Sequence, residues 1–116
     1  MRANRPTRWY SNKQEKKVAK AVGGKQTPNS GSTCHTKGDV LTSGNDGGWC
    51  FECKVHMEPM NKFTIKKEWI DKNREEAFQM GKRHSALVLD FGDGEQHYLI
   101  SERDFLQYKK YLEEDI

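Results

Sequence analysis

Six turn-forming residues in succession, at positions 43–48, separate two segments that favour extended backbone. The first segment is Asp39–Thr42, and the second is Trp49–Val55, in which large apolar and polar side chains alternate. A period of two is typical of a half-buried strand, and Gly, Asn and Asp between two such segments favour a tight turn. The pattern predicts an antiparallel hairpin with its turn centred near Asp46.

Helical and extended patterns flank this hairpin on both sides. The expected elements are a helix at 12–22 ended by Gly23 and Gly24, a loop at 26–37, a helix at 65–80 ended by Gly81, strands at 85–91 and 96–100, and a last helix capped by Ser101 with apolar side chains at Phe105, Leu106, Tyr108 and Leu112. The order helix, strand, strand, helix, strand, strand, helix predicts a small mixed sheet flanked by helices, in the α/β or α+β class.

The size and polarity of the chain limit what it can be. Its 116 residues are 34% hydrophobic and 32% charged, which predicts one domain at 13–116 with a thin core, preceded by a basic arm at 1–12. We expect a soluble, cytoplasmic protein, because no apolar run is long enough for a membrane span or a signal peptide. Three cysteines without an export signal favour reduced thiols.

Positive charge is concentrated near the N-terminus. Residues 1–38 carry nine Lys or Arg and one acid, Glu15, for a net charge of +8, whereas the rest of the chain has a net charge of −5. A one-sided basic segment that also contains Trp9 and Tyr10 is typical of a nucleic-acid-binding surface. A solvated or partly disordered basic arm is the alternative interpretation.

The second hairpin segment places a carboxylate and an amine on one face. Alternation assigns Trp49, Phe51, Cys53 and Val55 to one side of the strand, and Cys50, Glu52 and Lys54 to the other. With the turn near Asp46, the numbers of paired residues sum to about 92, which puts Asp39 opposite Cys53 and within one residue of Glu52. Two converging carboxylates predict a hard cation such as Mg²⁺, with Mn²⁺ as a substitute.

Such a site has the parts needed for phosphodiester hydrolysis. A metal ion can lower the pKa of a bound water and offset charge on a phosphoryl group, while Lys54 can hold the attacking water. The alternative is that Glu52 and Lys54 form a solvated ion pair on a strand face, with no chemistry.

Asp39, twelve residues, Glu52, one residue and Lys54 together resemble the signature of the PD-(D/E)xK nuclease superfamily, with Gly38 where the motif's Pro often stands. Glu15 on the first helix, the loop Ser30–Ser32 and the helix beginning near Ile65 are similar in order to archaeal and phage-encoded Holliday-junction resolvases, over roughly 13–90. The resemblance implies a restriction-endonuclease-like αβββαβ core, Asp39 and Glu52 as metal ligands, Lys54 as the catalytic lysine and Glu15 as an additional acid. It also implies an endodeoxyribonuclease that leaves 5′-phosphates, acts as a homodimer on branched or duplex DNA and is phage-encoded, working in a prokaryotic cytosol.

Several basic and hydroxyl side chains are candidates for DNA contacts. They are Arg8, Lys13, Lys16, Ser30, Ser32, Lys37, Lys66 and Lys67. The two serines flank a Gly that lets backbone approach a phosphate, and the last two lysines begin a helix whose N-terminus favours anions. A plain turn and a solvated helix face are the alternatives. Trp9 and Tyr10 could stack on a DNA branch.

Two other classes of function compete with the nuclease. Cys34-His35 and Cys50-x-x-Cys53-x-x-His56 contain zinc-ligating residue types, which suggests a zinc-stabilised interaction domain. On a straight strand, however, Cys50 and Cys53 point to opposite faces, so we expect Cys53 to be a small core residue. The other class is a non-catalytic DNA-binding or recombination accessory protein.

Overall fold

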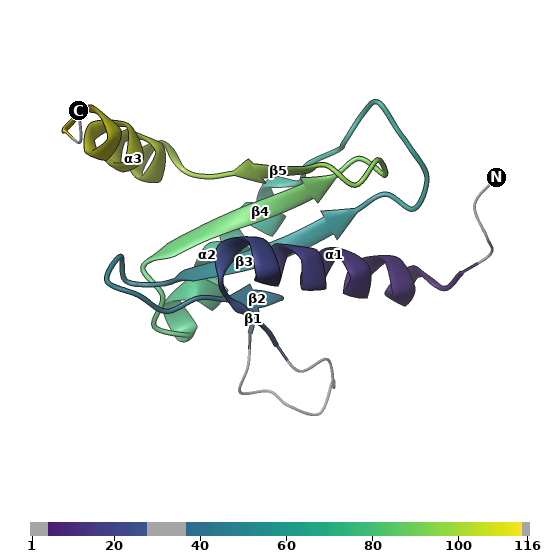
Figure 1. Ribbon diagram of the computed structural model, residues 1–116, viewed down its shortest axis with the longest axis horizontal. Helices are drawn as coiled ribbons and strands as arrows, with labels where there is room; N and C mark the ends of the chain where they lie inside the picture. The colour runs from purple at the N-terminus through teal and green to yellow at the C-terminus, as the bar shows by residue number, and fades with distance from the viewer. Residues whose placement is uncertain (1–4, 28–36, 115–116) are drawn as a thin grey trace.

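The computed structural model describes residues 5–27 and 37–114, which form three helices and one five-stranded sheet (Figure 1). The elements are α1 (Thr7–Val22), β1 (Lys25–Gln26), β2 (Val40–Leu41), β3 (Trp49–Val55), α2 (Lys67–Gln79), β4 (His84–Asp90), β5 (Gln96–Leu99) and α3 (Glu102–Glu114). The strands lie in chain order across the sheet, with β3 and β4 parallel and every other pair antiparallel. The predicted class, a mixed α/β fold with helices flanking a small sheet, is confirmed.

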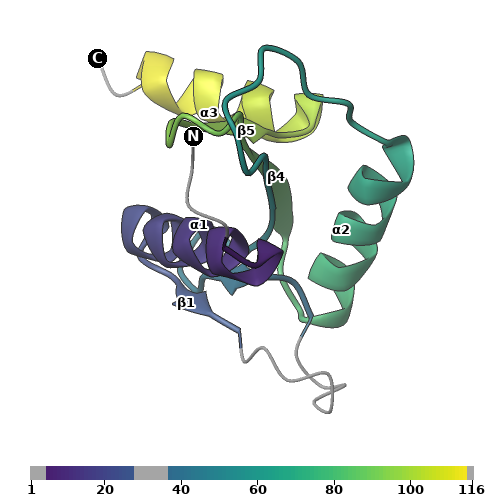
Figure 2. The same ribbon diagram turned by 90° about the vertical axis from the view of Figure 1, so that its right-hand side faces the viewer.

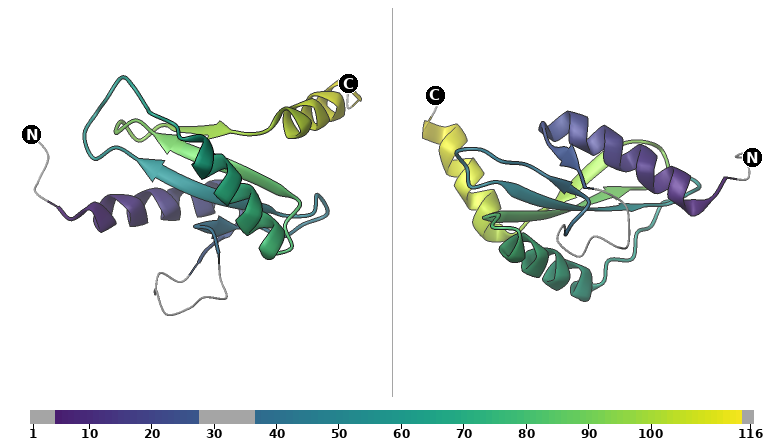
Figure 3. Two further views of the ribbon diagram at one scale, coloured as in Figure 1. Left: turned by 180° about the vertical axis from the view of Figure 1, so that it is seen from behind. Right: turned by 90° about the horizontal axis from the view of Figure 1, so that it is seen from below.

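The sheet separates the first two helices. α1 covers one face and α2, which connects the parallel strands β3 and β4, covers the other (Figures 2 and 3). α3 lies beyond the end of the sheet rather than over either face. No helix in the described part of the chain is both long enough and apolar enough to cross a bilayer.

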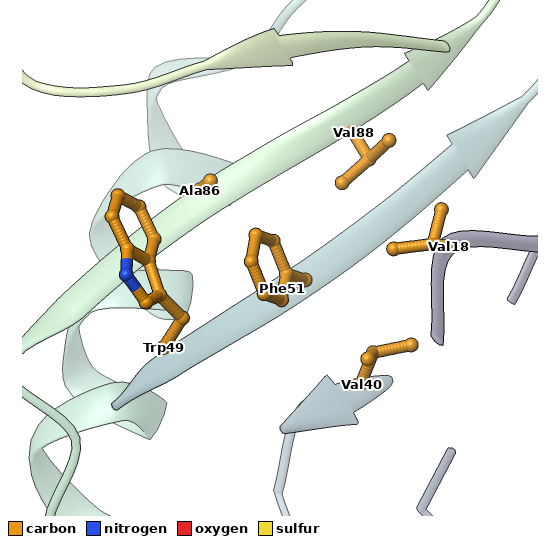
Figure 4. Close-up of a cluster of buried hydrophobic side chains, with 6 residues drawn as sticks. All are labelled: Val18, Val40, Trp49, Phe51, Ala86 and Val88. Atoms are coloured by element: carbon orange, nitrogen blue, oxygen red, sulfur yellow. The ribbon is translucent and has the colours of Figure 1, made fainter. Parts of the chain in front are cut away.

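The core lies between α1 and the sheet. Val18 of α1 packs over side chains from β2, β3 and β4, and the cluster consists of Val18, Val40, Trp49, Phe51, Ala86 and Val88 (Figure 4). The predicted apolar face of the second hairpin strand is confirmed, because Trp49 and Phe51 are buried and Cys53 packs against the cluster. Val55, at the end of that face, is half-buried.

The predicted start of the first helix is wrong by five residues. α1 begins at Thr7 rather than Asn12, so residues 7–12 are helical and not part of an arm. Pro6 occupies the N-cap, where a residue without an N–H loses no helical hydrogen bond. The buried stripe of α1 includes Gln14 and Glu15 with Tyr10 and Val18, so a search for apolar periodicity misses its first two turns.

Two further corrections concern the hairpin and the loop before it. Gln26, expected to begin a loop, instead belongs to β1, which pairs with β2. Val40 pairs with Phe51, so partner numbers sum to 91 rather than 92. The other predicted elements agree with the observed bounds to within two residues.

A buried polar contact joins α3 to the sheet. Asp104, which is 2% exposed, is the buried residue of α3, and its Oδ1 lies 2.7 Å from Nδ1 of His84 on β4. The other ring nitrogen of His84 lies 2.8 Å from the Asp46 carbonyl oxygen. The Asp104 amide donates to Ser101 Oγ at 3.2 Å, as the predicted cap requires. Phe105, Leu106 and the other large apolar side chains of α3 are about half exposed or more.

Replacing Asp104 with Ala should therefore destabilise the protein strongly. Removing one partner of a buried pair leaves His84 unpaired, and we expect a loss of about 3 kcal/mol in the free energy of unfolding, measured by urea denaturation. Glu102→Ala, an exposed acid in the same helical turn, is the matched control and should cost less than about 1 kcal/mol. Equal losses in the two variants would contradict the anchoring role.

Candidate functional site

Asp39 is held by hydrogen bonds from three directions. Its amide donates to the Phe51 carbonyl oxygen at 3.0 Å, and its carbonyl oxygen accepts from the Thr27 amide at 3.0 Å. Its carboxylate Oδ2 accepts from the Cys53 amide at 2.8 Å. The carboxylate thus takes the place of the next backbone acceptor along β3, and its position is fixed by the sheet itself.

Gly38 makes this arrangement possible. Its φ of +81° turns the chain away from β3 just before Asp39, and a Cβ at this position would collide with Cys50 Sγ. Proline, whose ring fixes φ near −65°, cannot adopt this conformation. The departure from the motif's usual Pro therefore has a physical reason in this chain.

Glu52 and Lys54 lie beside Asp39 on the α2 side of the sheet. Continuing the register of β2 and β3 puts Asp39 opposite Glu52, one residue from the predicted Cys53, and the two carboxyl groups are within hydrogen-bonding reach. Lys54 Nζ lies 3.5 Å from Glu52 Oε2, with both side chains largely buried, and 4.5 Å from the centre of the Trp69 ring. Two acids and an amine predicted to converge are thus brought together.

Burial and mutual repulsion shift the acids of this cluster. Burial, followed by the charge of Asp39, raises the pKa of Glu52 to about 7, although the Lys54 ammonium opposes the shift. Burial also raises the pKa of Asp39, against the Cys53 hydrogen bond and Lys54, which lower it. The local cations therefore leave the negative charge of this pair incompletely balanced.

Glu15 reaches the same cluster from α1. It is 6% exposed, and its Oε1 accepts a hydrogen bond of 3.1 Å from Gln26 Nε2 on β1. Burial, followed by the charge of Asp39, raises the pKa of Glu15 to about 7, while Gln26 and Arg8 lower it. The acid on the apolar stripe of α1 is therefore electrostatically coupled to Asp39.

Residues of α2 that the sequence reasoning missed complete the site. A pocket of about 400 Å³ lies between β3 and α2, lined by Glu52, Lys54, Glu68, Trp69, Lys72 and Asn73. The Lys72 charge lowers the pKa of both Asp39 and Glu52, whereas Glu76 raises the pKa of Glu52. The spacing of 68, 72 and 76 on one helical face, beside the half-buried Trp69, is the sequence signal that could have identified them.

The donor set fits a hard divalent cation better than zinc. Asp39 and Glu52 offer carboxylate oxygens, and Mg²⁺ needs one or two carboxylates when water and phosphate complete its shell. Within residues 5–27 and 37–114, no group of three or more His, Cys, Asp or Glu is arranged to hold a metal ion. Any Mg²⁺ here would therefore depend on oxygen atoms from water and substrate.

The cysteines are poor ligands where they stand. Burial, with added repulsion from acidic neighbours, raises the pKa of Cys50 to about 12 and that of Cys53 further, which disfavours the thiolate that zinc requires. Cys50 is fully buried, with Asn73 Nδ2 donating to its carbonyl oxygen at 3.1 Å, while Cys53 packs against the α1-side core. Cys34 and His35 lie outside the described residues.

The predicted DNA contacts are scattered over the surface. Arg8, Lys13 and Lys16 are exposed on α1, and Lys37 is half-buried just before Gly38. Lys66 is the N-cap of α2 and exposed, whereas Lys67 forms an exposed ion pair of 3.0 Å with Asp71. Tyr10 is buried and cannot stack on DNA, but Trp9 is half-buried. Ser30 and Ser32 lie outside the described part of the chain.

Comparison of this chain with protein-family models, curated proteins and solved structures finds no match.

The raised carboxyl pKa values make the stability depend on pH. In EDTA, Glu15 and Glu52 favour folding fully below about pH 4.5, and this contribution falls as pH rises to about 7, because the folded protein binds these protons more tightly than the unfolded chain. Urea unfolding from pH 4 to 8 should show Glu15→Gln gaining stability over wild type across that window. Glu114→Gln, at an exposed acid, should show no such trend, and a pH-independent difference for Glu15→Gln would contradict the assignment.

Proposed function

We propose that this protein is a metal-dependent endonuclease that hydrolyses phosphodiester bonds in DNA. The observation that carries the proposal is the convergence of Asp39, Glu52 and Lys54, with Glu15 behind them, beside a pocket open to a ligand. The order helix, three strands, helix, strand from α1 to β4 supports the same assignment, because it is the order that the PD-(D/E)xK resemblance implies.

Each residue of the cluster has a distinct part in such a reaction. Asp39 and Glu52 would hold Mg²⁺, and Mn²⁺ as a substitute, which when bound polarises the phosphate and acidifies a water. Lys54, kept near Glu52 by their ion pair and near Trp69 by its ring, is positioned to orient the attacking water and to balance charge on the phosphoryl oxygens. Glu15 adds negative charge behind Asp39 and strengthens cation binding.

Lys72 extends this set. It is an exposed side chain in the wall of the same pocket as Glu52 and Lys54, and its charge acts on both Asp39 and Glu52. A cation at the mouth of an acidic site is suited to draw in a phosphodiester that would otherwise be repelled. We assign Lys72 to contact with the DNA phosphate at the scissile position.

The basic N-terminal region favours branched or duplex DNA as the substrate, and within that class we place Holliday-junction resolution first. Cutting both strands of a junction symmetrically requires two active sites, so we propose a homodimer. The products would carry 5′-phosphates. A phage-encoded protein working in a prokaryotic cytosol is the setting that fits this function.

Conservative substitution of the acids should separate cutting from binding. We expect Asp39→Asn and Glu52→Gln to lower cleavage of a synthetic four-way junction in Mg²⁺ by about 1,000-fold while junction binding is kept, because basic residues supply most of the affinity. Cleavage is followed on end-labelled junction, flap and linear duplex, with Mg²⁺ and with EDTA, mapping the nicks. Wild-type-like cutting by either variant sinks the proposal, and DNA binding without any cutting by the wild type favours a non-catalytic accessory protein.

Neutralising Lys72 should slow cutting with little effect on the fold. Lys72→Gln removes an exposed cation facing the acids, and we expect about a tenfold loss of cleavage rate with unchanged unfolding in urea. Arg74→Gln, an exposed cation of the same helix outside the pocket lining, is the matched control and should cut nearly as wild type. Equal losses in both variants would mean that the overall charge of α2, rather than the position of Lys72, matters.

A further inference from the structure

A second polar cleft lies on the other side of α1 from Glu15. It has a volume of about 400 Å³ and lies between α1 and the turn at 92–94 that follows β4. The α1 side of its lining includes Arg5, Trp9, Lys13 and Lys17, and the opposite side includes His56 and Asp93. The N-terminal half of α1, the ends of β3 and β4 and the turn before β5 all lie at the same end of the molecule (Figure 1).

The cations of this cleft form one row. Positions 5, 9, 13 and 17 follow each other at intervals of four, which is the spacing of one face of a helix. The Arg5 guanidinium lies 4.3 Å from the centre of the Trp9 ring, and Lys13 Nζ lies 5.0 Å from it. Neither Arg5 nor Lys13 forms an ion pair with a carboxylate of the described residues, so both charges are available to an anionic ligand.

The acids of the cleft are occupied by the turn. Asp90 Oδ1 accepts from the amides of Gly92 and Gly94 at 2.8 and 3.1 Å, and its Oδ2 accepts from Gln96 Nε2 at 2.7 Å. Asp93 Oδ1 accepts from the amide of Glu95 at 3.0 Å. These hydrogen bonds disperse the negative charge, and the three cations dominate the opening.

The walls are built rather than loose. Trp9 stands edge-on to the buried Tyr10, with ring centres 5.0 Å apart, and Lys17 Nζ donates to the Gly94 carbonyl oxygen at 2.5 Å. Gly92 has a φ of +96° and backbone of Glu58 so close that no Cβ fits. Such a preformed cleft binds a ligand without first having to order itself.

Gln14 lies beneath this cleft and links it to the candidate site. It is 3% exposed, and its Nε2 donates to the Lys54 carbonyl oxygen at 3.0 Å and to the Val88 carbonyl oxygen at 3.1 Å. Its Oε1 is buried without a hydrogen-bond partner among the described residues, which leaves an acceptor in the cleft lining. Glu15, the next residue along α1, faces the acid cluster instead.

We propose that this cleft binds one unpaired nucleotide of the DNA substrate, with its phosphate between Lys13 and Lys17 and its base against the Arg5–Trp9 pair. The volume is within the range of small-molecule sites, roughly 300–1,000 Å³. Aromatic and guanidinium surfaces stack on any base, and the cations hold the backbone. The identification of the ligand as DNA rests on the proposed function, whereas binding in this cleft requires no metal ion.

The test is binding of a 12-residue oligothymidylate and of a four-way junction in EDTA, beside a linear duplex, across a range of salt concentrations. Arg5→Gln/Lys13→Gln should weaken oligothymidylate binding about tenfold and lower the salt slope by about 1.4, the value for two lost single-strand phosphate contacts. Lys109→Gln/Lys110→Gln, the same charge change on α3, should bind within twofold of wild type. Wild-type binding by the first variant, or equal losses in both, overturns the proposal.

Tryptophan fluorescence supplies an independent readout. Oligothymidylate should quench the wild-type emission, and Trp9→Phe, with unchanged circular dichroism, should lose that quenching. Quenching that survives in Trp9→Phe overturns the placement of the base. If the wild type never cuts DNA yet passes both binding tests, the cleft stands and the nuclease proposal falls; if it cuts and Arg5→Gln/Lys13→Gln binds and cuts normally, only the cleft proposal falls.

Discussion

The hydrogen bond from the Cys53 amide to the Asp39 carboxylate is the contact on which the site depends. It ties the residue that follows the Gly38 turn to the central strand β3, and it sets the Asp39 carboxylate beside Glu52 without a long flexible link. The cost is electrostatic, because two carboxyl groups are buried together with one lysine as their closest cation. A fold that holds such a pair in place spends stability on it, as functional sites commonly do.

The two faces of the sheet divide the work between stability and chemistry. On the α1 side, Val18 packs on Phe51 and Val88 and supplies most of the dry core. On the α2 side, the same strand β3 presents Glu52 and Lys54 to a pocket walled by Trp69. Strand alternation alone produces this separation, so the acidic cluster can be polar without disrupting the core. α1 joins the two functions, since its buried stripe contains both Val18 and Glu15.

The sequence was sufficient for the parts governed by local periodicity and turn chemistry. The alternation of β3 and the Gly-rich turn gave the hairpin and the shared face of Glu52 and Lys54. The start of α1 was missed because its buried stripe there is polar, and β1 was missed because two residues carry no period. The register was wrong by one residue because the Gly38 turn, not the tip of the hairpin, fixes Asp39. Lys72 and the Trp9 cleft depend on helix packing, which no local pattern encodes.

The most direct measurement is where a divalent cation binds. In ¹⁵N-labelled protein titrated with substoichiometric Mn²⁺, paramagnetic broadening decays steeply with distance from the ion. The account predicts that the amide resonances of Cys53 and Lys54 broaden first, and that excess Mg²⁺ restores them. Broadening that begins elsewhere, for example around Asp90 and Asp93, or no broadening at all, would contradict the claim that Asp39 and Glu52 form a cation site.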